Sequence, residues 1–293
     1  VYNLAGGVFN LSNRTARIAN AGVGTFNQSG GTSILYNVVV SFDTQSTGTC
    51  NFVGGELRLG GLVSKNNGAS AFNFGGGICV YPHATGFTIN GNTYPKLTGV
   101  NGLTRFCSTG SGFTNAIGDL SGPGGLVKEG ADTLNLAGTH SFTGPVVVSN
   151  GTLNVNAAMN GMNAVLIAGG RLNLNAGYRA AFQSLLVTGG VFQVASNSAL
   201  VIAASDPWVR VAGTGTVKLL GGSVIPGMTG LDISESGGID LSAGGTTYVY
   251  RLVVGGVAQS PGLFTAANCA AITGSGALVV GGGCWSGAGG DLQ

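Results

Sequence analysis

Convergent carboxylates, histidines and nucleophiles are what hydrolytic and lytic sites are built from, and this chain holds few of them. Its 293 residues include ten Asp and Glu side chains and two histidines that lie far apart. The closest carboxylates are Glu129 with Asp132 and Asp232 with Glu235. In a strand or a corner, a spacing of three residues puts such side chains on opposite faces or across a turn. Cleavage of polysaccharides needs two or three convergent acids, so we predict no catalytic residue and no enzyme.

Cofactor and metal motifs are also missing from the sequence. Gly213-x-Gly215 and Gly274-x-Gly276 lack the third glycine of a dinucleotide-binding fingerprint. No Gly-x-Ser-x-Gly flanked by strand and helix occurs, and neither does the Gly-Gly-x-Gly-x-Asp repeat that binds calcium. We therefore expect no cofactor and no metal site.

Five cysteines are the remaining reactive side chains: Cys50, Cys79, Cys107, Cys269 and Cys284. No two of them form a Cys-x-x-Cys pair, which argues against zinc binding. Their number fits an oxidising compartment. We predict a Cys269–Cys284 disulfide and one bond among the first three cysteines, and the odd cysteine is free or bonds another chain. The alternative is that they are buried free thiols acting as small apolar side chains.

Paired glycines indicate the secondary-structure elements that position these side chains. Gly6-Gly7, Gly30-Gly31 and Gly54-Gly55 recur every 24 residues beside short runs of alternating apolar and polar residues, such as Glu56-Leu57-Arg58-Leu59. A fixed period in the twenties indicates a chain that stacks successive turns. Glycine suits the tight corners because it adopts positive φ freely. We predict an all-β parallel β-helix, or β-solenoid. With turns of ~22 residues it would have roughly a dozen rungs and form a rod near 60 Å long, at ~4.8 Å per rung.

Later strand-like runs repeat the pattern with a looser period. Asn135, Asn154 and Asn173 each lie between two apolar residues, 19 residues apart. Stacked asparagines can hydrogen-bond along a solenoid as a ladder, and outward-facing polar positions are the alternative. The segment from Ala176 to Val187 is either a short helix or a pair of strands.

The period divides the chain into three stretches. Residues 1–80 are regular rungs, residues 81–123 are a loop-rich insertion, and residues 124–293 resume the solenoid. Insertions in solenoids often gather on one face and bind ligands there, although a surface loop without function is the other reading. The residues predicted as a possible ligand loop are Tyr81, His83, Tyr94, Lys96 and Arg105.

Charge is unusually sparse. Only 8% of residues are Asp, Glu, Lys or Arg, against roughly 25% in typical domains. The scattered basic residues argue against a nucleic-acid partner, and no apolar run is long enough to span a membrane. Such a chain either presents a neutral polar surface or buries part of its surface against copies of itself. It begins at Val1, which is expected of a processed product, although an arbitrary cut would look the same.

One segment resembles a known family. Residues 124–155 contain Gly125-Leu126, Lys128, Gly130, Thr133-Leu134, an aromatic-Thr-Gly step at 142–144, and Gly151-Thr152-Leu153. This pattern resembles the autotransporter-associated β-strand repeat of bacterial surface proteins, with Asp132 where that family usually has Gly. Residues 24–32 are similar to a second repeat of large secreted bacterial proteins, and residues 250–280 look like their closing module.

The resemblance implies a right-handed parallel β-helix, secreted and displayed at the bacterial cell surface, and it implies no activity. It also leads us to expect a passenger segment cleaved from its membrane barrel, or a secreted protein without one. The predicted function is a self-assembling structural subunit of a surface fibre or coat. The alternatives are a monomeric adhesin rod that binds glycans or surfaces, and a polysaccharide lyase or hydrolase on a β-helix.

Homopolymer formation would use the strand edges at the two ends. The predicted assembly residues are at one end Val1, Tyr2, Asn3 and Leu4, and at the other Ala277, Leu278, Val279 and Val280. Uncapped terminal strands expose unpaired backbone groups, and head-to-tail contacts of this kind propagate into filaments.

Overall fold

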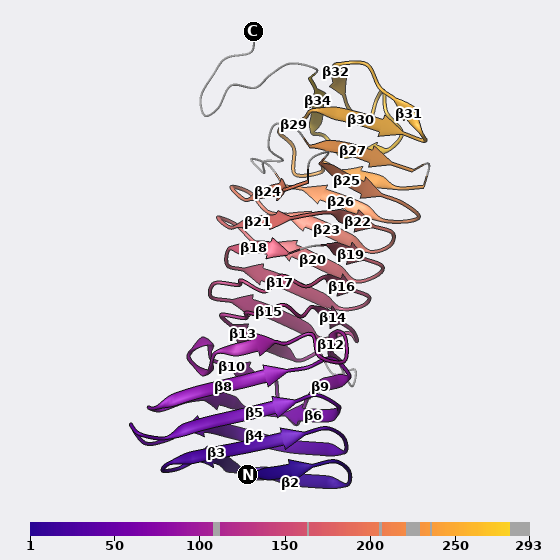
Figure 1. The fold of residues 1–293 in the computed structure, drawn as a ribbon. Helices are drawn as coiled ribbons and strands as arrows, with labels where there is room; N and C mark the ends of the chain where they lie inside the picture. Colours follow the sequence, from indigo (N-terminus) through magenta and orange to yellow (C-terminus); the bar gives the residue numbers. More distant parts are fainter. Residues whose placement is uncertain (108–111, 163, 205–206, 221–228, 235, 282–293) are drawn as a thin grey trace. The chain divides into compact units, whose positions relative to one another are not determined.

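The computed structural model describes residues 1–107, 112–162, 164–204, 207–220, 229–234 and 236–281. The chain divides into two compact units, Val1–Asn163 and Ala164–Gln293. Both are built from parallel strands stacked turn on turn (Figure 1), and the described residues make about 11 turns of β-solenoid. The predicted fold class is confirmed. The predicted division at residues 80 and 123 stays a prediction.

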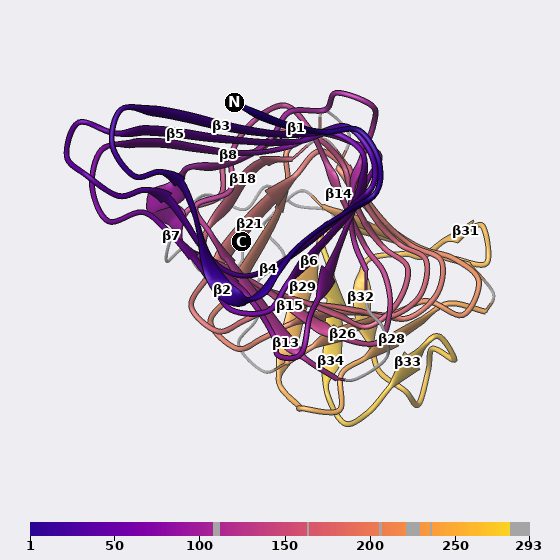
Figure 2. The ribbon, with the colours of Figure 1, turned by 90° about the horizontal axis from the view of Figure 1, so that it is seen from below.

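Three series of parallel strands, here called the first, second and third sheets, form the faces of the first unit, and Figure 2 shows its turns lying over one another. Two long strands join the second and third series into one continuous sheet. The first sheet consists of β1 (Tyr2–Leu4), β3 (Val23–Gln28), β5 (Thr47–Phe52), β8 (Ala69–Phe74) and β11 (Pro95–Leu97).

The second sheet begins with the first halves of β2 (Val8–Ala19) and β4 (Thr32–Ser41) and continues with β6 (Gly55–Leu59), β9 (Ile78–Pro82), β12 (Thr104–Phe106), β14 (Leu126–Lys128) and β16 (Val146–Val148). The third sheet takes the second halves of β2 and β4, then β7 (Leu62–Ser64), β10 (Thr88–Ile89), β13 (Thr114–Gly118), β15 (Thr133–Ala137) and β17 (Thr152–Asn156). This unit also contains the short helix η1 (Gly91–Thr93) and β18 (Met159–Met162).

The stretch predicted as a loop-rich insertion contains β10, η1, β11, β12 and β13. Its four strands pair in register with turns on either side, for example Pro95 with Phe72 and Thr114 with Thr133. Backbone hydrogen bonds therefore run through this stretch, and deleting it would remove paired strands.

The second unit repeats the design in two main parallel series. One contains β19 (Val165–Ile167), β22 (Leu185–Val187), β25 (Trp208–Val211), β27 (Gly230–Ile233) and β30 (Arg251–Val254), and the other β20 (Arg171–Leu174), β23 (Val191–Val194), β26 (Thr216–Leu219), β28 (Gly238–Asp240) and β33 (Ile272–Thr273). β21 (Arg179–Phe182) pairs with β24 (Ala199–Ile202). The ambiguous segment 176–187 therefore contains two strands, β21 and β22, and no helix.

Two antiparallel pairs interrupt the parallel pattern of the second unit. β31 (Val257–Ala258) pairs with β30, and β32 (Gly262–Phe264) pairs with β34 (Ala277–Val280), which also pairs with the parallel strand β29 (Thr246–Val249). Both edges of β34 are thus hydrogen-bonded within the chain. The assembly role predicted for Ala277, Leu278, Val279 and Val280 therefore does not follow from an unpaired strand edge, since β32 occupies it, and that role stays a prediction.

Apolar side chains that alternate along each strand fill the interior. In the first unit, Phe26, Phe52, Phe72, Phe74 and Phe106 are buried. Neighbouring rings along this column lie 5.1–5.8 Å apart between centroids, within the range in which aromatic pairs stabilise each other. Alternation at a period of two is what directs these rings inward.

Glycine is required where successive turns approach most closely. Gly55 has φ +82°, and a Cβ there would lie 2.2 Å from the carbonyl oxygen of Gly31 on the previous turn. Gly31 in turn has φ +71° and lies against Gly7. The paired glycines therefore recur because each corner sits on the corner before it. Within the described ranges, no helix has the length and apolar character needed to cross a bilayer.

Candidate functional site

An outward-facing group on the second sheet brings together the most reactive side chains of the first unit. We call Cys79, Tyr81, Arg105, Cys107 and Glu129 the outer-face cluster. Cys79 and Tyr81 come from β9, Arg105 from β12, and Cys107 and Glu129 directly follow β12 and β14. Because alternate residues of a strand share a face, and the register pairs Arg105 with Cys79, the cluster spans three consecutive turns.

An ion pair organises the cluster. Arg105 Nε lies 3.1 Å from both carboxylate oxygens of Glu129, and Arg105 Nη2 donates to Oε2 at 2.6 Å. Arg105 Nη1 donates to Cys79 Sγ at 3.3 Å, and Cys107 Sγ donates to Glu129 Oε2 at 3.5 Å. The guanidinium therefore bridges a thiol and a carboxylate on different turns, and the second thiol binds the same carboxylate.

These contacts set the ionisation of the cluster. The hydrogen bonds from Arg105 lower the pKa of Glu129. Burial, followed by the neighbouring Cys79, raises the pKa of Cys107 to about 12. Burial, followed by the nearby thiols, raises the pKa of Tyr81 to about 12. At neutral pH Cys107 is therefore a protonated thiol held against an ionised carboxylate.

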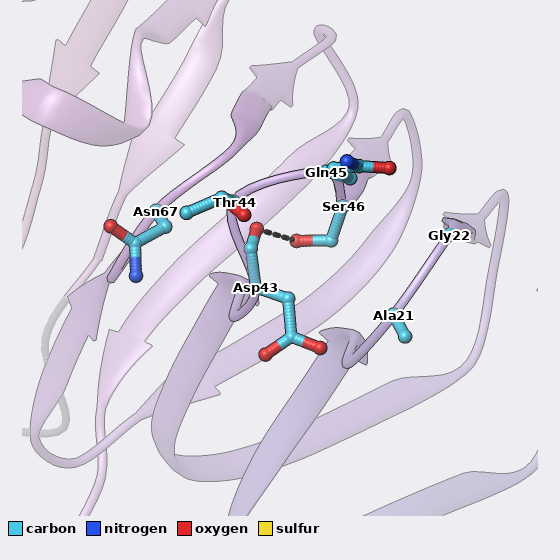
Figure 3. A pocket seen from close by; sticks show the side chains of 7 residues that line it. All are labelled: Ala21, Gly22, Asp43, Thr44, Gln45, Ser46 and Asn67. Carbon is cyan, nitrogen blue, oxygen red and sulfur yellow. Dashed lines mark hydrogen bonds between the residues drawn. The ribbon is translucent and has the colours of Figure 1, made fainter.

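A polar hollow of about 550 Å³ lies at the corner where the chain passes from the third sheet to the first (Figure 3). We call it the corner groove; it is lined by Ala21, Gly22, Asp43, Thr44, Gln45, Ser46 and Asn67. These residues come from three successive turns, after β2, β4 and β7. Stacking of turns therefore produces a shallow trough across neighbouring corners.

Local hydrogen bonds shape the groove. Ser46 donates to the Asp43 carbonyl through its backbone N–H at 3.0 Å and through Oγ at 2.7 Å, and Asn67 Nδ2 donates to Phe42 O at 3.4 Å. Figure 3 shows the Asp43 carboxylate directed away from this turn. Within the part of the chain that the structure describes, no group donates a hydrogen bond to that carboxylate. The groove thus offers a carboxylate acceptor beside side-chain amides and a hydroxyl, the chemistry that suits a neutral polyhydroxylated ligand.

The residues of the predicted ligand loop are divided among different faces. Tyr81 and Arg105 share the outer-face cluster. Tyr94 follows η1 with φ 53°, and Lys65 Nζ lies 4.8 Å from its ring centroid. Lys96 is exposed in β11. His83 follows β9, and its backbone N–H donates to the Leu59 carbonyl at 2.7 Å. That the five form one binding loop stays a prediction; the structure brings only Tyr81 and Arg105 to one cluster.

The cysteines occupy three different environments. Cys50 is buried between Phe26 and Phe72 in the register of the first sheet, and burial raises the pKa of its thiol. Cys79 and Cys107 lie in the outer-face cluster, and Cys269 is half-buried in the second unit. All four are free thiols in the structure. Cys284, the predicted partner of Cys269, lies outside the described residues, so that disulfide stays a prediction.

Two buried polar side chains have structural tasks that the sequence did not reveal. Lys128 Nζ donates to the carbonyls of Glu129 and Gly130 at 2.6 and 2.8 Å, and burial lowers its pKa to about 8. His140 Nδ1 accepts the backbone N–H of Leu120 at 3.1 Å, and burial lowers its pKa to about 4. Both hold corners together from inside.

Asparagine side chains form ladders along the strands. Asn154 donates to Asn135 at 2.8 Å, which favours the ladder reading over the alternative for these two residues. A second ladder runs along the first sheet from Asn73 to Asn51 to Asn27 to Asn3, with every bond 2.8 Å long. Its members are separated by 22, 24 and 24 residues, and the two separations of 24 equal the period of the glycine pairs. This shared spacing of asparagines and glycine pairs is the feature of the sequence from which the second ladder could have been predicted.

Three of the four carboxylates that lie closest in sequence contact different partners. Glu129 binds Arg105, Asp132 Oδ1 accepts the N–H of Phe113 at 3.0 Å, and Asp232 lies 3.9 Å from Arg210. Glu235 lies outside the described residues. Across the described ranges, no three His, Cys, Asp or Glu side chains converge in a way that could hold a metal ion.

Comparison with known proteins identifies one segment. The passenger-associated-transport-repeat family matches residues 126–155, which run from β14 into β17. The chain is also similar to the adhesin BmaC autotransporter of Brucella suis biovar 1 (strain 1330), with 38% identity over 74 residues. That match covers 25% of this chain and 2% of the adhesin, and no solved structure matches. The chain therefore carries a repeat of the autotransporter passenger type, and the resemblance predicted from its sequence is confirmed.

Proposed function

We propose that this chain is a non-enzymatic, extracellular part of a bacterial surface adhesin, and that its corner groove binds neutral glycans on the target surface. The observation that carries the proposal is a passenger-type repeat within a β-solenoid whose neighbouring corners form a polar groove. The similarity to an autotransporter adhesin supports the same role. The solenoid acts as the rigid scaffold, and the corner loops act as the binding surface.

The groove has the chemistry that a sugar needs. Vicinal hydroxyls of a saccharide can donate to the Asp43 carboxylate while accepting from the amides of Gln45 and Asn67. These three side chains are exposed and lie on neighbouring turns. Because the groove is open and polar, we expect weak binding at each site, strengthened when many copies are displayed together.

A glycan array followed by titration with the purified chain tests the proposal. Asp43→Ala and Asn67→Ala are expected to lose binding, whereas Ser141→Ala, at an exposed site on a different turn, keeps it. Asp43→Asn separates a requirement for charge from one for hydrogen bonding. Binding that survives Asp43→Ala and Asn67→Ala but is lost in Tyr94→Ala or Lys96→Ala would move the site to the predicted ligand loop. Point substitutions are used because deletion of residues 81–123 would remove paired strands.

Self-association of copies into a surface fibre or coat is the second candidate, supported by the low charge content of 8%. At the first turn, the exposed Tyr2, the half-buried Phe9 and the buried Phe26 line a hollow of about 160 Å³. Sedimentation velocity and electron microscopy test this candidate. Concentration-dependent oligomers or ordered fibres that Tyr2→Asp abolishes would support it, and a single monomeric species at all concentrations would refute it.

A further inference from the structure

Cys79 and Cys107 face the same side of the second sheet on consecutive turns. Arg105 pairs with Cys79 and Phe106 with Val80, and the N–H of Cys107 donates to the Val80 carbonyl at 2.8 Å. Cys107 is therefore the diagonal neighbour of Cys79, two residues further along. Cys79 is half-buried, and Cys107 is 7% exposed.

Cys50 cannot reach this pair from where it lies. It is 1% exposed and points into the aromatic interior of the first sheet. The sequence predicts one disulfide among Cys50, Cys79 and Cys107 without choosing the pair. Of these three, only Cys79 and Cys107 share a face of the sheet.

The neighbours of the two thiols differ in a way that suits exchange chemistry. Arg105 Nη1 donates to Cys79 Sγ at 3.3 Å, so the sulfur of Cys79 lies beside a cation on the outer face. Cys107 instead donates to Glu129 Oε2 at 3.5 Å. In thiol–disulfide exchange the thiolate is the nucleophile, and Cys107 must give up its proton to solvent before it can attack.

We propose that Cys79 and Cys107 are an oxidisable dithiol that closes to an intrachain disulfide linking two successive turns. Cys79 thiolate attacks a small-molecule disulfide, which leaves a mixed disulfide on Cys79 and releases one thiolate. Cys107, after losing its proton to solvent, attacks the Cys79 sulfur and releases the second thiolate. The chain loses two hydrogen atoms, and the small-molecule disulfide is reduced to two thiols.

Closure requires a movement of Cys107. Diagonal neighbours in a sheet have Cα atoms roughly 7–8 Å apart, and a disulfide accepts about 4.4–6.8 Å. β9 is paired with β6 as well as β12 and holds Cys79 firmly. Cys107 lies one residue beyond the end of β12, so its shift toward Cys79 would give up one hydrogen bond, from its backbone N–H to the Val80 carbonyl.

Peptide mapping tests the proposal directly. Trypsin cuts after Arg17, Arg58, Lys65, Lys96, Arg105 and Lys128, which places Cys50, Cys79 and Cys107 on separate peptides. After treatment of the folded chain with oxidised glutathione and alkylation of free thiols, we expect a cross-linked pair of peptides 66–96 and 106–128 that dithiothreitol separates. Cys79→Ser and Cys107→Ser should abolish it, and Cys269→Ser, at a half-buried site in the other unit, should leave it unchanged.

Circular dichroism of each serine variant shows whether the solenoid is intact, so loss of the cross-link is not confused with unfolding. Stable glutathione adducts on both cysteines of a folded chain, or a cross-link to the Cys50 peptide, would overturn the proposal. So would complete alkylation of Cys79 and Cys107 after oxidation. The outcome is independent of whether the corner groove binds glycans.

Discussion

Asn51 donates its side-chain amide to the side-chain carbonyl of Asn27, one full turn away, at 2.8 Å. Asn51 also accepts from Asn73 at the same distance, so it is an interior member of the ladder. Asn3 accepts a single ladder bond from Asn27 and is exposed. The ladder therefore offers a graded test of what stacked amides contribute.

Asn51→Ala removes two side-chain hydrogen bonds and is expected to lower the free energy of unfolding by about 1–2 kcal/mol, at roughly 1 kcal/mol per bond. Asn3→Ala removes one bond at an exposed position, and we expect about half that loss or less. Urea unfolding followed by circular dichroism measures both. Equal effects of the two substitutions would show that the ladder does not act as a series of local bonds.

Acid destabilisation is expected from His140. Its pKa is about 4 in the folded chain, against about 6.5 in an unfolded one. The unfolded state therefore binds more protons between these values, and stability falls as pH drops from 6.5 towards 4, by about 3 kcal/mol when the transition is complete. His140→Asn provides a non-titrating acceptor for the Leu120 N–H. Its stability should change less over this range, and parallel pH profiles for the two proteins would contradict the prediction.

We expect the stability of the chain to depend on pH at alkaline values because of Lys128. Its pKa of about 8 in the folded chain lies below the ordinary value near 10.4, so the folded state releases this proton more readily. The contribution of Lys128 to stability therefore rises as pH increases from 8 towards 10. Lys128→Met should abolish that contribution and lower stability overall, because two carbonyls lose their donor. The measurement is the difference between the two pH profiles; a difference that stays constant with pH would refute the assignment.

The corner contact of Gly55 gives a prediction with a matched control. Gly55→Ala must accommodate a Cβ at φ +82° and 2.2 Å from a backbone oxygen, and we expect a loss above about 1 kcal/mol. At Gly6, an added Cβ meets nothing within 4 Å, so Gly6→Ala should be close to neutral. Thermal unfolding of both variants is the measurement, and a near-wild-type melting temperature for Gly55→Ala would contradict the close packing of the corners.

An aromatic truncation tests the interior column. Phe52→Ala removes a fully buried ring that lies 5.1 Å from Phe72 and 5.8 Å from Phe26. Such substitutions cost about 3–5 kcal/mol. Leu62→Ala, at an exposed apolar position of the same unit, is expected to change stability by less than about 0.5 kcal/mol. Similar losses for the two would place the stabilising interior elsewhere.

Much of the fold could be predicted because the repeat period of the turns is visible in the sequence. Gly6-Gly7, Gly30-Gly31 and Gly54-Gly55 mark corners that stack, and the ladder from Asn154 to Asn135 follows from a polar residue between two apolar ones. The long strands β2 and β4, of 12 and 10 residues, did not follow from the short alternating runs in the sequence. They continue past a corner because the chain bends there with a register shift in place of a turn.

The candidate site was much less predictable. The corner groove joins residues from three loops whose positions depend on how the loops stack, and no local motif marks Asp43 and Asn67 as neighbours. Cys79 and Cys107 were named from the sequence, but their shared face depends on a register that only the pairing of β9 with β12 fixes. The occupied edge of β34 depends on the return of β32, which alternation in a single strand cannot show.

The pairing of each turn with the next has a consequence for how the first unit folds. Ladder partners are 19, 22 or 24 residues apart, and this separation is set by the circumference of one turn. Adding turns lengthens the unit without lengthening the loops that must close, so relative contact order falls as the array grows. The free energy then approximates a sum of single-turn and nearest-neighbour interface terms, as in a one-dimensional chain of coupled sites. A weakened turn in the middle can therefore act as a boundary between independently melting blocks.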